Sequence, residues 1–246
     1  RKSNGLEWQL LQSMKGCLSC NACVSKCPVG VSIPKARDEY LRYFSSKYKL
    51  FNHVSIYSHL EWLSYIIGFL PAYLKRVLNG RFSNTIIRKT LGLTSSPDFS
   101  VLSLRRFMHK NNIRYAKKDL LSTDKSKHVV VIVLDMFTAY YHTNIVIEFI
   151  QLLAKLDISC YVMPFQSSGK SAKSVGDFRL FEKQAGQLCE NLTRLTLANS
   201  RVNFVCIEPS IALYFRADCV DYNLIKTGDK KILLPQEFLL NYFDSG

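Results

Sequence analysis

The chain has 246 residues, of which 48% are hydrophobic and 21% charged, as expected for a globular protein of one large or two modest domains. The longest apolar run, residues 63–74, contains Pro71 and is shorter than the about 20 residues that a membrane-spanning helix needs. The formal net charge is +14, and its distribution along the chain is uneven.

The positive charge lies in the first half of the chain. Residues 1–50 carry nine Lys and Arg against three Asp and Glu, residues 51–127 carry 13 against four, and residues 128–246 carry 11 against 12. A polar stretch at 117–127 looks like a linker, so we predict two domains, 1–127 and 128–246. The basic half could offset the charge of a bound metal cluster or receive an acidic partner. Nucleic acid is not expected, because the charges are dispersed and no reader motif accompanies them.

The first domain is predicted to be helical. Apolar residues recur with a helical period over residues 6–14, and Pro34 opens a second helix that runs to about Tyr48. Further helices are expected at about 53–70, 72–79, 84–91 and 101–116. No alternating pattern that would indicate a β-strand precedes residue 128.

Between the first two helices lies a cluster of four cysteines with the spacing Cys17-x2-Cys20-x2-Cys23-x3-Cys27, followed by Pro28. Three thiolates at two-residue gaps can wrap a tight loop around one [4Fe–4S] cluster. Zinc sites more often pair two such knuckles across a longer spacer. The spacing therefore predicts an iron–sulfur site, and clustered rather than disulfide-forming cysteines favour a cytoplasmic location.

The role of Cys27 is open at this point. In proteins with two clusters, the cysteine before the proline ligates the neighbouring cluster. Its partner motif would then lie upstream of Arg1. Alternatively, Cys27 closes the same cluster, or one of four scattered cysteines completes it. Those four are more simply read as buried small hydrophobic residues: Cys160, Cys189, Cys206 and Cys219.

The second domain is predicted to be α/β, with a mostly parallel sheet. The β-branched run at 128–134 is typical of a buried parallel strand, and further strands are expected at 158–163, 202–207 and 231–234. Helices are expected at 143–156, at about 174–197 and after Pro209. Strands that alternate with helices indicate βαβ units, so the fold class of the whole chain is α+β.

Loops at the carboxyl ends of parallel strands are where ligands gather. A possible docking or pocket loop set therefore consists of Asp135, Ser167, Ser168, Lys170 and Glu208. The simpler interpretation, which we favour, is that Asp135 and Glu208 cap helices while the Ser-Ser-Gly segment makes a turn. No residue of this chain is predicted to be catalytic.

Several segments together resemble the C-terminal part of large FAD-linked D-2-hydroxyacid dehydrogenases, most closely the bacterial enzymes that act on D-2-hydroxyglutarate. The resemblance is carried by residues 14–34, 91–104, 134–142, 162–170, 207–216 and 232–240. It implies an upstream FAD-binding domain, an upstream second cysteine motif and an external electron acceptor. Flavin would take a hydride from the hydroxyacid, and [4Fe–4S] clusters would pass the electrons on singly. In this resemblance Cys17, Cys20 and Cys23 hold one cluster and Cys27 reaches its neighbour.

The second domain also resembles the cysteine-rich domains of heterodisulfide-reductase and glycerol-3-phosphate dehydrogenase subunits, in which a Cys-Cys-Gly signature supports metal or thiol chemistry. Here Ser167-Ser168-Gly169 stands at that place. Hydroxyls are poor substitutes for thiolate ligands, so this domain is expected to have lost that chemistry.

Two functions from different classes follow. The first is the electron-transfer region of a flavin dehydrogenase, without the catalytic site itself. The second is a stand-alone iron–sulfur subunit of a glycerol-3-phosphate dehydrogenase or heterodisulfide-reductase-like complex. A weaker third idea is peripheral membrane contact through the aromatic helix near Trp62, for which core packing is the better interpretation.

Overall fold

The computed structural model describes residues 2–17, 19, 22–48, 57–80, 83, 85, 97–126, 128–225 and 231–244. These form two compact units, Arg1–Leu60 with Gly169–Lys183, and Glu61–Ser168 with Gln184–Gly246. The units divide the chain differently from the two predicted domains, because the segment after Gly169 packs with the N-terminal helices rather than with the sheet.

The first unit is helical. It contains α1 (Lys2–Lys15), α2 (Ala22–Lys26), α3 (Ile33–Tyr48), α12 (Lys170–Ser174) and the first turns of α13 (Phe178–Ala198). The first and third of these confirm the predicted helices around the cysteine loop. The long helix predicted at about 174–197 is α13, which begins four residues later than expected because Gly176 adopts a φ of +87° and separates it from the short α12.

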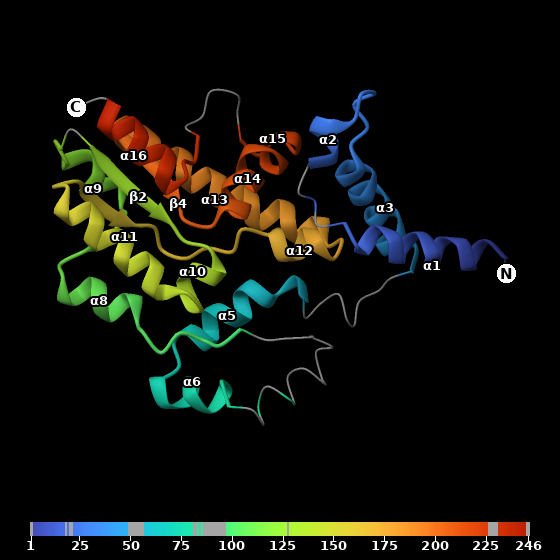
Figure 1. Ribbon diagram of the computed structural model, residues 1–246, viewed down its shortest axis with the longest axis horizontal. Helices are drawn as coiled ribbons and strands as arrows, with labels where there is room; N and C mark the ends of the chain where they lie inside the picture. The colour runs from blue at the N-terminus through green and yellow to red at the C-terminus, as the bar shows by residue number, and fades with distance from the viewer. Residues whose placement is uncertain are drawn as a thin grey trace. The chain divides into compact units, whose positions relative to one another are not determined.

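The second unit is built on a four-stranded parallel sheet. Its strands are β1 (Arg114–Tyr115), β2 (Val129–Val133), β3 (Ser159–Val162) and β4 (Val202–Cys206), in the order β1-β3-β2-β4. Its helices are α5 (Leu60–Gly68), α6 (Ala72–Leu78), α8 (Leu104–Lys110), α9 (Lys118–Thr123), α10 (Met136–Tyr140), α11 (Thr143–Lys155), α14 (Pro209–Arg216), α15 (Asp218–Asp221) and α16 (Pro235–Asp244). Figure 1 shows α11 and α16 beside the strands. The predicted α+β class and parallel sheet are thus confirmed.

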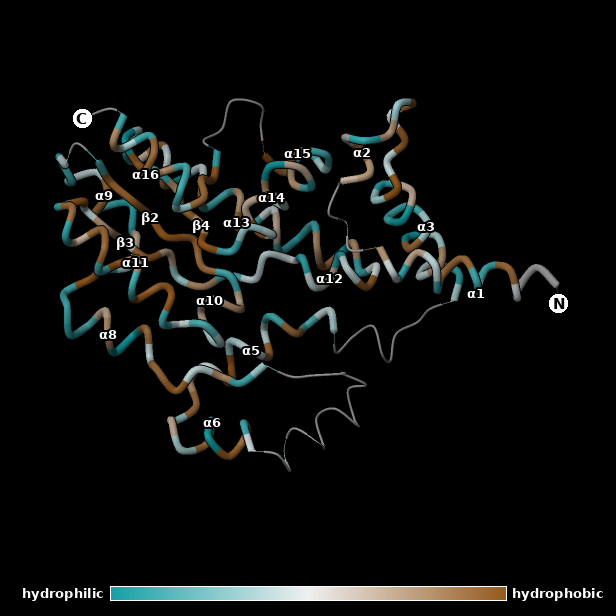
Figure 2. Tube along the Cα trace, viewed as in Figure 1, coloured by the Kyte–Doolittle hydropathy of each residue, from teal (hydrophilic) through white to brown (hydrophobic). Residues whose placement is uncertain are grey.

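The core of this unit lies on the central strand. All five residues of β2 are at most 2% exposed, so both of its faces are covered, as in buried parallel sheets. Val130 and Ile132 pack with residues of α8, α11 and α16, including Met108, Phe149 and Phe238. Figure 2 shows β2 as hydrophobic along its length, and β4 is hydrophobic except at Asn203. This is the reason that the apolar runs identified their strands correctly.

Three predicted features differ from the structure. The strand β1 precedes residue 128, where none was predicted, and it lies inside the helix predicted at 101–116, of which only α8 (Leu104–Lys110) is helical. The two residues of β1 are exposed and gain strand geometry from pairing with β3. The predicted linker at 117–127 carries α9, with Leu121 fully buried. The segment 231–234 makes a single parallel bridge from Leu233 to Val205 rather than a full strand. The predicted helix at 84–91 lies almost entirely outside the described residues.

Asp124 lies in the stretch that was predicted to be a linker, and its hydrogen bonds lead to a testable prediction. Burial alone would raise the pKa of Asp124, but hydrogen bonds from Ser126, Ser159 and Tyr161 outweigh it and lower the pKa from 3.8 to about 2. A lowered carboxyl pKa stabilises the folded state above pH 3.8, and this stability is lost as the pH falls towards 2. Because solvent screens this partly exposed carboxylate, Asp124→Asn should cost at most about 1 kcal/mol at pH 7 and should flatten the pH dependence of unfolding between pH 4 and 2. Urea unfolding at several pH values measures the loss of stability and its pH dependence. The same change at the exposed Asp119 should leave both quantities nearly unchanged.

Candidate metal centre

The cysteine loop connects α1 to α3. Cys17 lies two residues after the end of α1, and its N–H donates to the carbonyl of Met14 at 3.1 Å. Cys23 is exposed on α2, and Cys27 follows that helix, half-buried, with its N–H donating to the carbonyl of Cys23 at 2.9 Å. Cys20 lies outside the described residues. The short helix thus separates two of the predicted ligands by one helical turn.

The thiol of Cys27 lies in a nest of backbone N–H groups. The N–H of Val31 donates to its Sγ at 3.3 Å, and the chain turns there because Gly30 has a φ of +70°. Hydrogen bonds from the backbone of Val31 and Val29, and a smaller one from Gly30, lower the pKa of Cys27, while desolvation opposes them. The thiolate is the form that binds metal, so this turn prepares Cys27 for ligation.

The cysteine side chains of this loop are chemically suited to an iron–sulfur cluster, because they are soft thiols and one of them accepts backbone hydrogen bonds. Among the residues that the structure describes, however, no group of three or more His, Cys, Asp and Glu side chains is close enough together to hold a metal ion. Cys17, Cys23 and Cys27 are therefore not assembled into a site by themselves. The cluster and its four ligands stay a prediction.

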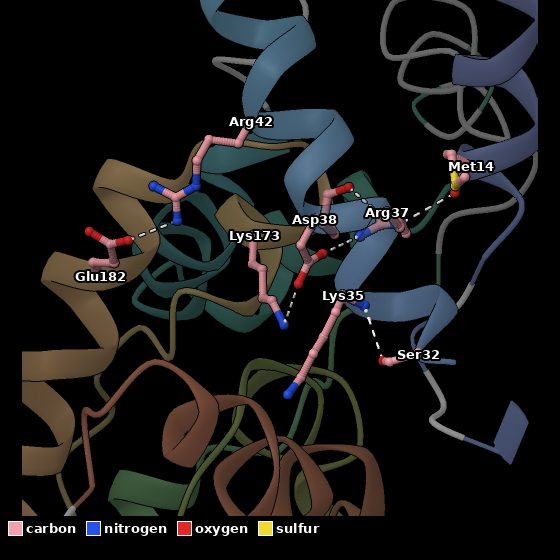
Figure 3. Close-up of polar contacts among 9 residues, drawn as sticks. Met14, Ser32, Lys35, Arg37, Asp38, Arg42, Lys173 and Glu182 are labelled. Carbon is pink, nitrogen blue, oxygen red and sulfur yellow. Dashed lines mark hydrogen bonds and ion pairs between the residues drawn. The ribbon is translucent and has the colours of Figure 1, made fainter. Parts of the chain in front are cut away.

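A buried ion-pair cluster supports the helix that follows this loop. On α3, Arg37 Nη1 lies 3.1 Å from Asp38 Oδ1, and Lys173 Nζ of α12 lies 3.0 Å from the other carboxylate oxygen. All three side chains are less than a tenth exposed. Figure 3 shows Asp38 pointing towards Lys173 while Arg37 extends the opposite way, towards Met14.

Arg37 connects three segments of the first unit. Its Nε donates to the carbonyl of Met14 at 3.2 Å (Figure 3), and its Nη2 donates to the carbonyl of Ser174 at 2.7 Å. Met14 lies three residues before Cys17, so the guanidinium holds the end of α1 where the cysteine loop begins. Asp38 lies between the two buried cations, and the three side chains together carry a formal charge of +1.

The sequence analysis did not select Arg37, Asp38 or Lys173, although the apolar stripe of α3 could have identified the first two. Pro34, Leu41 and Phe44 form the buried stripe of α3, and the helical period places Arg37 and Asp38 on the same stripe. Charged residues on an apolar stripe indicate a buried pair. Its partner, Lys173, could not be found from the period, because it lies more than 130 residues away in the sequence.

The two predicted helix caps are confirmed. Asp135 is buried and accepts hydrogen bonds from the N–H groups of Phe137 at 2.8 Å and Thr138 at 3.1 Å, which begins α10. Burial raises the pKa of Asp135, and these hydrogen bonds oppose the rise. Glu208 accepts from the N–H of Ser210 at 3.3 Å and begins α14. Capping accounts for both carboxylates.

The Ser-Ser-Gly segment is held by residues that the sequence interpretation did not select. The N–H and the hydroxyl of Ser168 both donate to the buried carboxylate of Glu61 on α5, the hydroxyl at 3.1 Å. The Tyr214 hydroxyl donates to the Ser168 carbonyl at 2.7 Å. Ser167 is half-buried in the same unit, whereas Lys170 belongs to the other compact unit. A ligand-binding role for this loop stays a prediction.

The scattered cysteines behave as packing residues. Cys189, Cys206 and Cys219 are buried, as predicted, and Cys160 is half-buried. Burial raises the pKa of Cys160 to about 12. A hydrogen bond with Cys189, together with burial, raises the pKa of Cys219 as well. These environments disfavour the thiolates that a metal would need.

The chain is similar, over nearly its whole length, to one class of oxidoreductases, the D-2-hydroxyglutarate dehydrogenases, which confirms the resemblance drawn from the sequence. It is 28% identical to the D-2-hydroxyglutarate dehydrogenase of Haemophilus influenzae over 92% of this chain, and 26% identical to that of Escherichia coli over 96%. The protein of that name from Pseudomonas putida is 25% identical over 95%. The chain spans 22–23% of the length of these relatives. No family model matches the chain, and no solved structure matches it significantly.

Among the described residues, none of the helices combines the length and the apolar character required to cross a bilayer.

Proposed function

We propose that this chain is the electron-transfer region of a FAD-dependent D-2-hydroxyacid dehydrogenase, which carries electrons from flavin through [4Fe–4S] clusters to an external acceptor. The observation that carries the proposal is the Cys17–Cys27 motif inside a chain similar, over more than nine-tenths of its length, to proteins named D-2-hydroxyglutarate dehydrogenase. The flavin domain, a second cysteine motif, the hydroxyacid substrate and a cytoplasmic location all belong to the proposal.

Cys17, Cys20, Cys23 and Cys27 would hold iron. When bound, a [4Fe–4S] cluster accepts and releases one electron at a time. The residues of this chain would prepare its place. The turn at Gly30 directs backbone N–H groups at the Cys27 sulfur, which favours the thiolate. Arg37 holds the end of α1 beside Cys17.

The buried charges of the first unit also support a bound [4Fe–4S] cluster. A cluster with four thiolate ligands carries net negative charge, and nearby cations stabilise it. The cluster of Arg37, Asp38 and Lys173 contributes one excess positive charge to the unit that contains the cysteine loop. Because these side chains are buried, salt screens their field less than it screens that of surface lysines.

Anaerobic reconstitution with iron and sulfide tests the proposal. The 246-residue chain should bind at most one labile [4Fe–4S] cluster, measured as iron and sulfide per chain. Cys20→Ser should abolish binding, because a hydroxyl replaces a soft thiolate at the centre of the loop. Cys27→Ser should reduce binding less if Cys27 serves a neighbouring cluster.

The control is Cys160→Ser, which removes a thiol outside the loop and should leave the iron content unchanged. Equal and complete loss in the Cys20 and Cys27 variants would show that Cys27 closes the same cluster. One bound zinc ion with no sulfide would contradict the electron-transfer function itself. A full-length protein without flavin would favour the stand-alone iron–sulfur subunit.

A further inference from the structure

The carbonyl oxygen of Met14 accepts two hydrogen bonds where the cysteine loop begins. One comes from the N–H of Cys17 at 3.1 Å, and the other comes from Nε of Arg37 at 3.2 Å (Figure 3). Met14 belongs to the last turn of α1, where backbone carbonyls have no partner within the helix. A single carbonyl at the end of α1 therefore connects the first cysteine of the loop to a side chain of α3.

The guanidinium of Arg37 has a partner at each of its three nitrogen atoms. Besides the bond from Nε to Met14, Nη2 donates to the carbonyl of Ser174 at 2.7 Å, and Nη1 lies 3.1 Å from Oδ1 of Asp38. The side chain is 7% exposed, so water competes little for these donors. A planar guanidinium donates in fixed directions, and the contacts to Ser174 and Asp38 therefore orient Nε towards Met14.

The two ends of the cysteine loop are fixed by different means. At the far end, the Cys27 sulfur accepts from the N–H of Val31 at 3.3 Å, within a local turn. At the near end, Cys17 depends on the Met14 carbonyl and so on Arg37, whose further partner Ser174 lies more than 150 residues later in the chain but in the same compact unit. Only the near end needs a long-range contact.

We infer that Arg37 is a positioning residue for iron binding: by fixing the Met14 carbonyl, it holds Cys17 in place before an iron–sulfur cluster assembles. A ligand whose backbone is already fixed loses less conformational entropy when it binds, and partners that orient a ligand contribute strongly to metal affinity. The inference rests on the proposed function and deepens it, because it assigns a part of the site to a residue outside the cysteine motif.

Arg37→Lys separates positioning from charge. The variant keeps the positive charge of the side chain, but one nitrogen atom cannot reproduce the three directed contacts to Met14, Ser174 and Asp38. After anaerobic reconstitution, the variant should lose iron to a chelator about tenfold faster than the unchanged chain. If Arg37 acted only through its charge, the two chains would lose iron at the same rate.

The metal-free chain gives a second readout that requires no iron. The Cys17 amide should be protected from hydrogen exchange in the unchanged chain, because its N–H is bonded to Met14. In Arg37→Lys this amide should exchange about tenfold faster, the factor that corresponds to one hydrogen bond to a charged group. The amides within α3 should change little under conditions in which circular dichroism shows the variant to be folded. A merely structural role would instead raise exchange throughout α1 and α3.

The matched control is Tyr40→Phe, which removes another hydrogen bond from α3 to a carbonyl of α1. The Tyr40 hydroxyl donates to the carbonyl of Glu7 at 2.5 Å, away from the cysteine loop. This variant should leave iron loss and Cys17 exchange unchanged.

Unchanged iron loss and unchanged Cys17 exchange in Arg37→Lys overturn the inference, and so do equal changes in Tyr40→Phe. If Arg37→Lys does not fold, the unchanged chain still decides, because a Cys17 amide that exchanges as fast as one without a hydrogen bond also overturns it. A chain that binds no iron and sulfide at all contradicts the proposed function instead, whereas the exchange of the metal-free chain tests the positioning alone.

Discussion

Asp38→Asn should destabilise the protein by about 3–5 kcal/mol. The substitution keeps the shape of the side chain but removes the carboxylate that lies within 3.1 Å of the buried cations of Arg37 and Lys173. Removing one partner of a buried ion pair has this large cost because the other charge stays desolvated and uncompensated. Urea unfolding followed by circular dichroism measures the change.

A second ion pair, also between α3 and the segment Gly169–Lys183, provides the control. Arg42 of α3 lies 3.0 Å from Glu182 of α13, with side chains that are 52% and 45% exposed. Solvent screens this pair, so Glu182→Gln should cost at most about 1 kcal/mol. Equal losses from the two acid-to-amide changes would contradict the view that burial makes the Asp38 cluster important.

The Asp38 variant also has an expected effect on the cysteine loop. Once Arg37 lacks its carboxylate partner, its hydrogen bond to the Met14 carbonyl is less well oriented. The end of α1 beside Cys17 then has one fixed contact fewer. We expect less iron bound per folded chain in Asp38→Asn than in Glu182→Gln, under conditions in which both are folded.

Gly169→Ala is the second substitution with a large expected effect, a loss of about 2–4 kcal/mol. The residue has a φ of +81°, where an alanine is strained by about 1–2 kcal/mol. Its Cβ would also lie 2.8 Å from the carbonyl oxygen of Phe181, and a backbone atom cannot move aside as a side chain can. The denaturation midpoint in urea should fall accordingly.

Gly186→Ala tests whether this effect comes from position rather than from the loss of glycine. Gly186 lies inside α13, and a Cβ there would meet nothing closer than the Leu224 side chain at 3.9 Å. Alanine has a higher helix propensity, so this variant should be more stable by about 0.5–1 kcal/mol. Destabilisation by both variants would point instead to tight packing along the whole of α12 and α13.

Local sequence patterns predicted the helices and strands that are stabilised mainly by their own side chains. The run from Val129 to Val133 was recognised as a buried parallel strand because every residue in it is apolar. The helices at α1, α3 and α11 followed from their apolar period. Asp135 and Glu208 were recognised as caps because a cap bonds to the backbone two or three residues away.

Features that depend on distant partners required the tertiary structure. The strand β1 has no pattern of its own, since its two residues take their geometry from pairing with β3. The charges of Arg37 and Asp38 are tolerated in the interior because Lys173 completes the cluster. Trp62 and Phe69 are largely exposed because α5 is held through Glu61, Ser64 and Tyr65, whose partners Ser168, Tyr141 and Phe165 lie far along the chain.

The sequence by itself determined the chemistry of the cysteine loop: four thiols at a spacing suited to an iron–sulfur cluster. The N–H groups at Cys27 come from the local turn at Gly30, whereas the tertiary structure brought the Arg37 guanidinium to the end of α1. The physical reason is the separation along the chain between the residues that interact. Spacing along the chain fixes which ligands can share one loop, whereas folding decides which buried charges lie beside it.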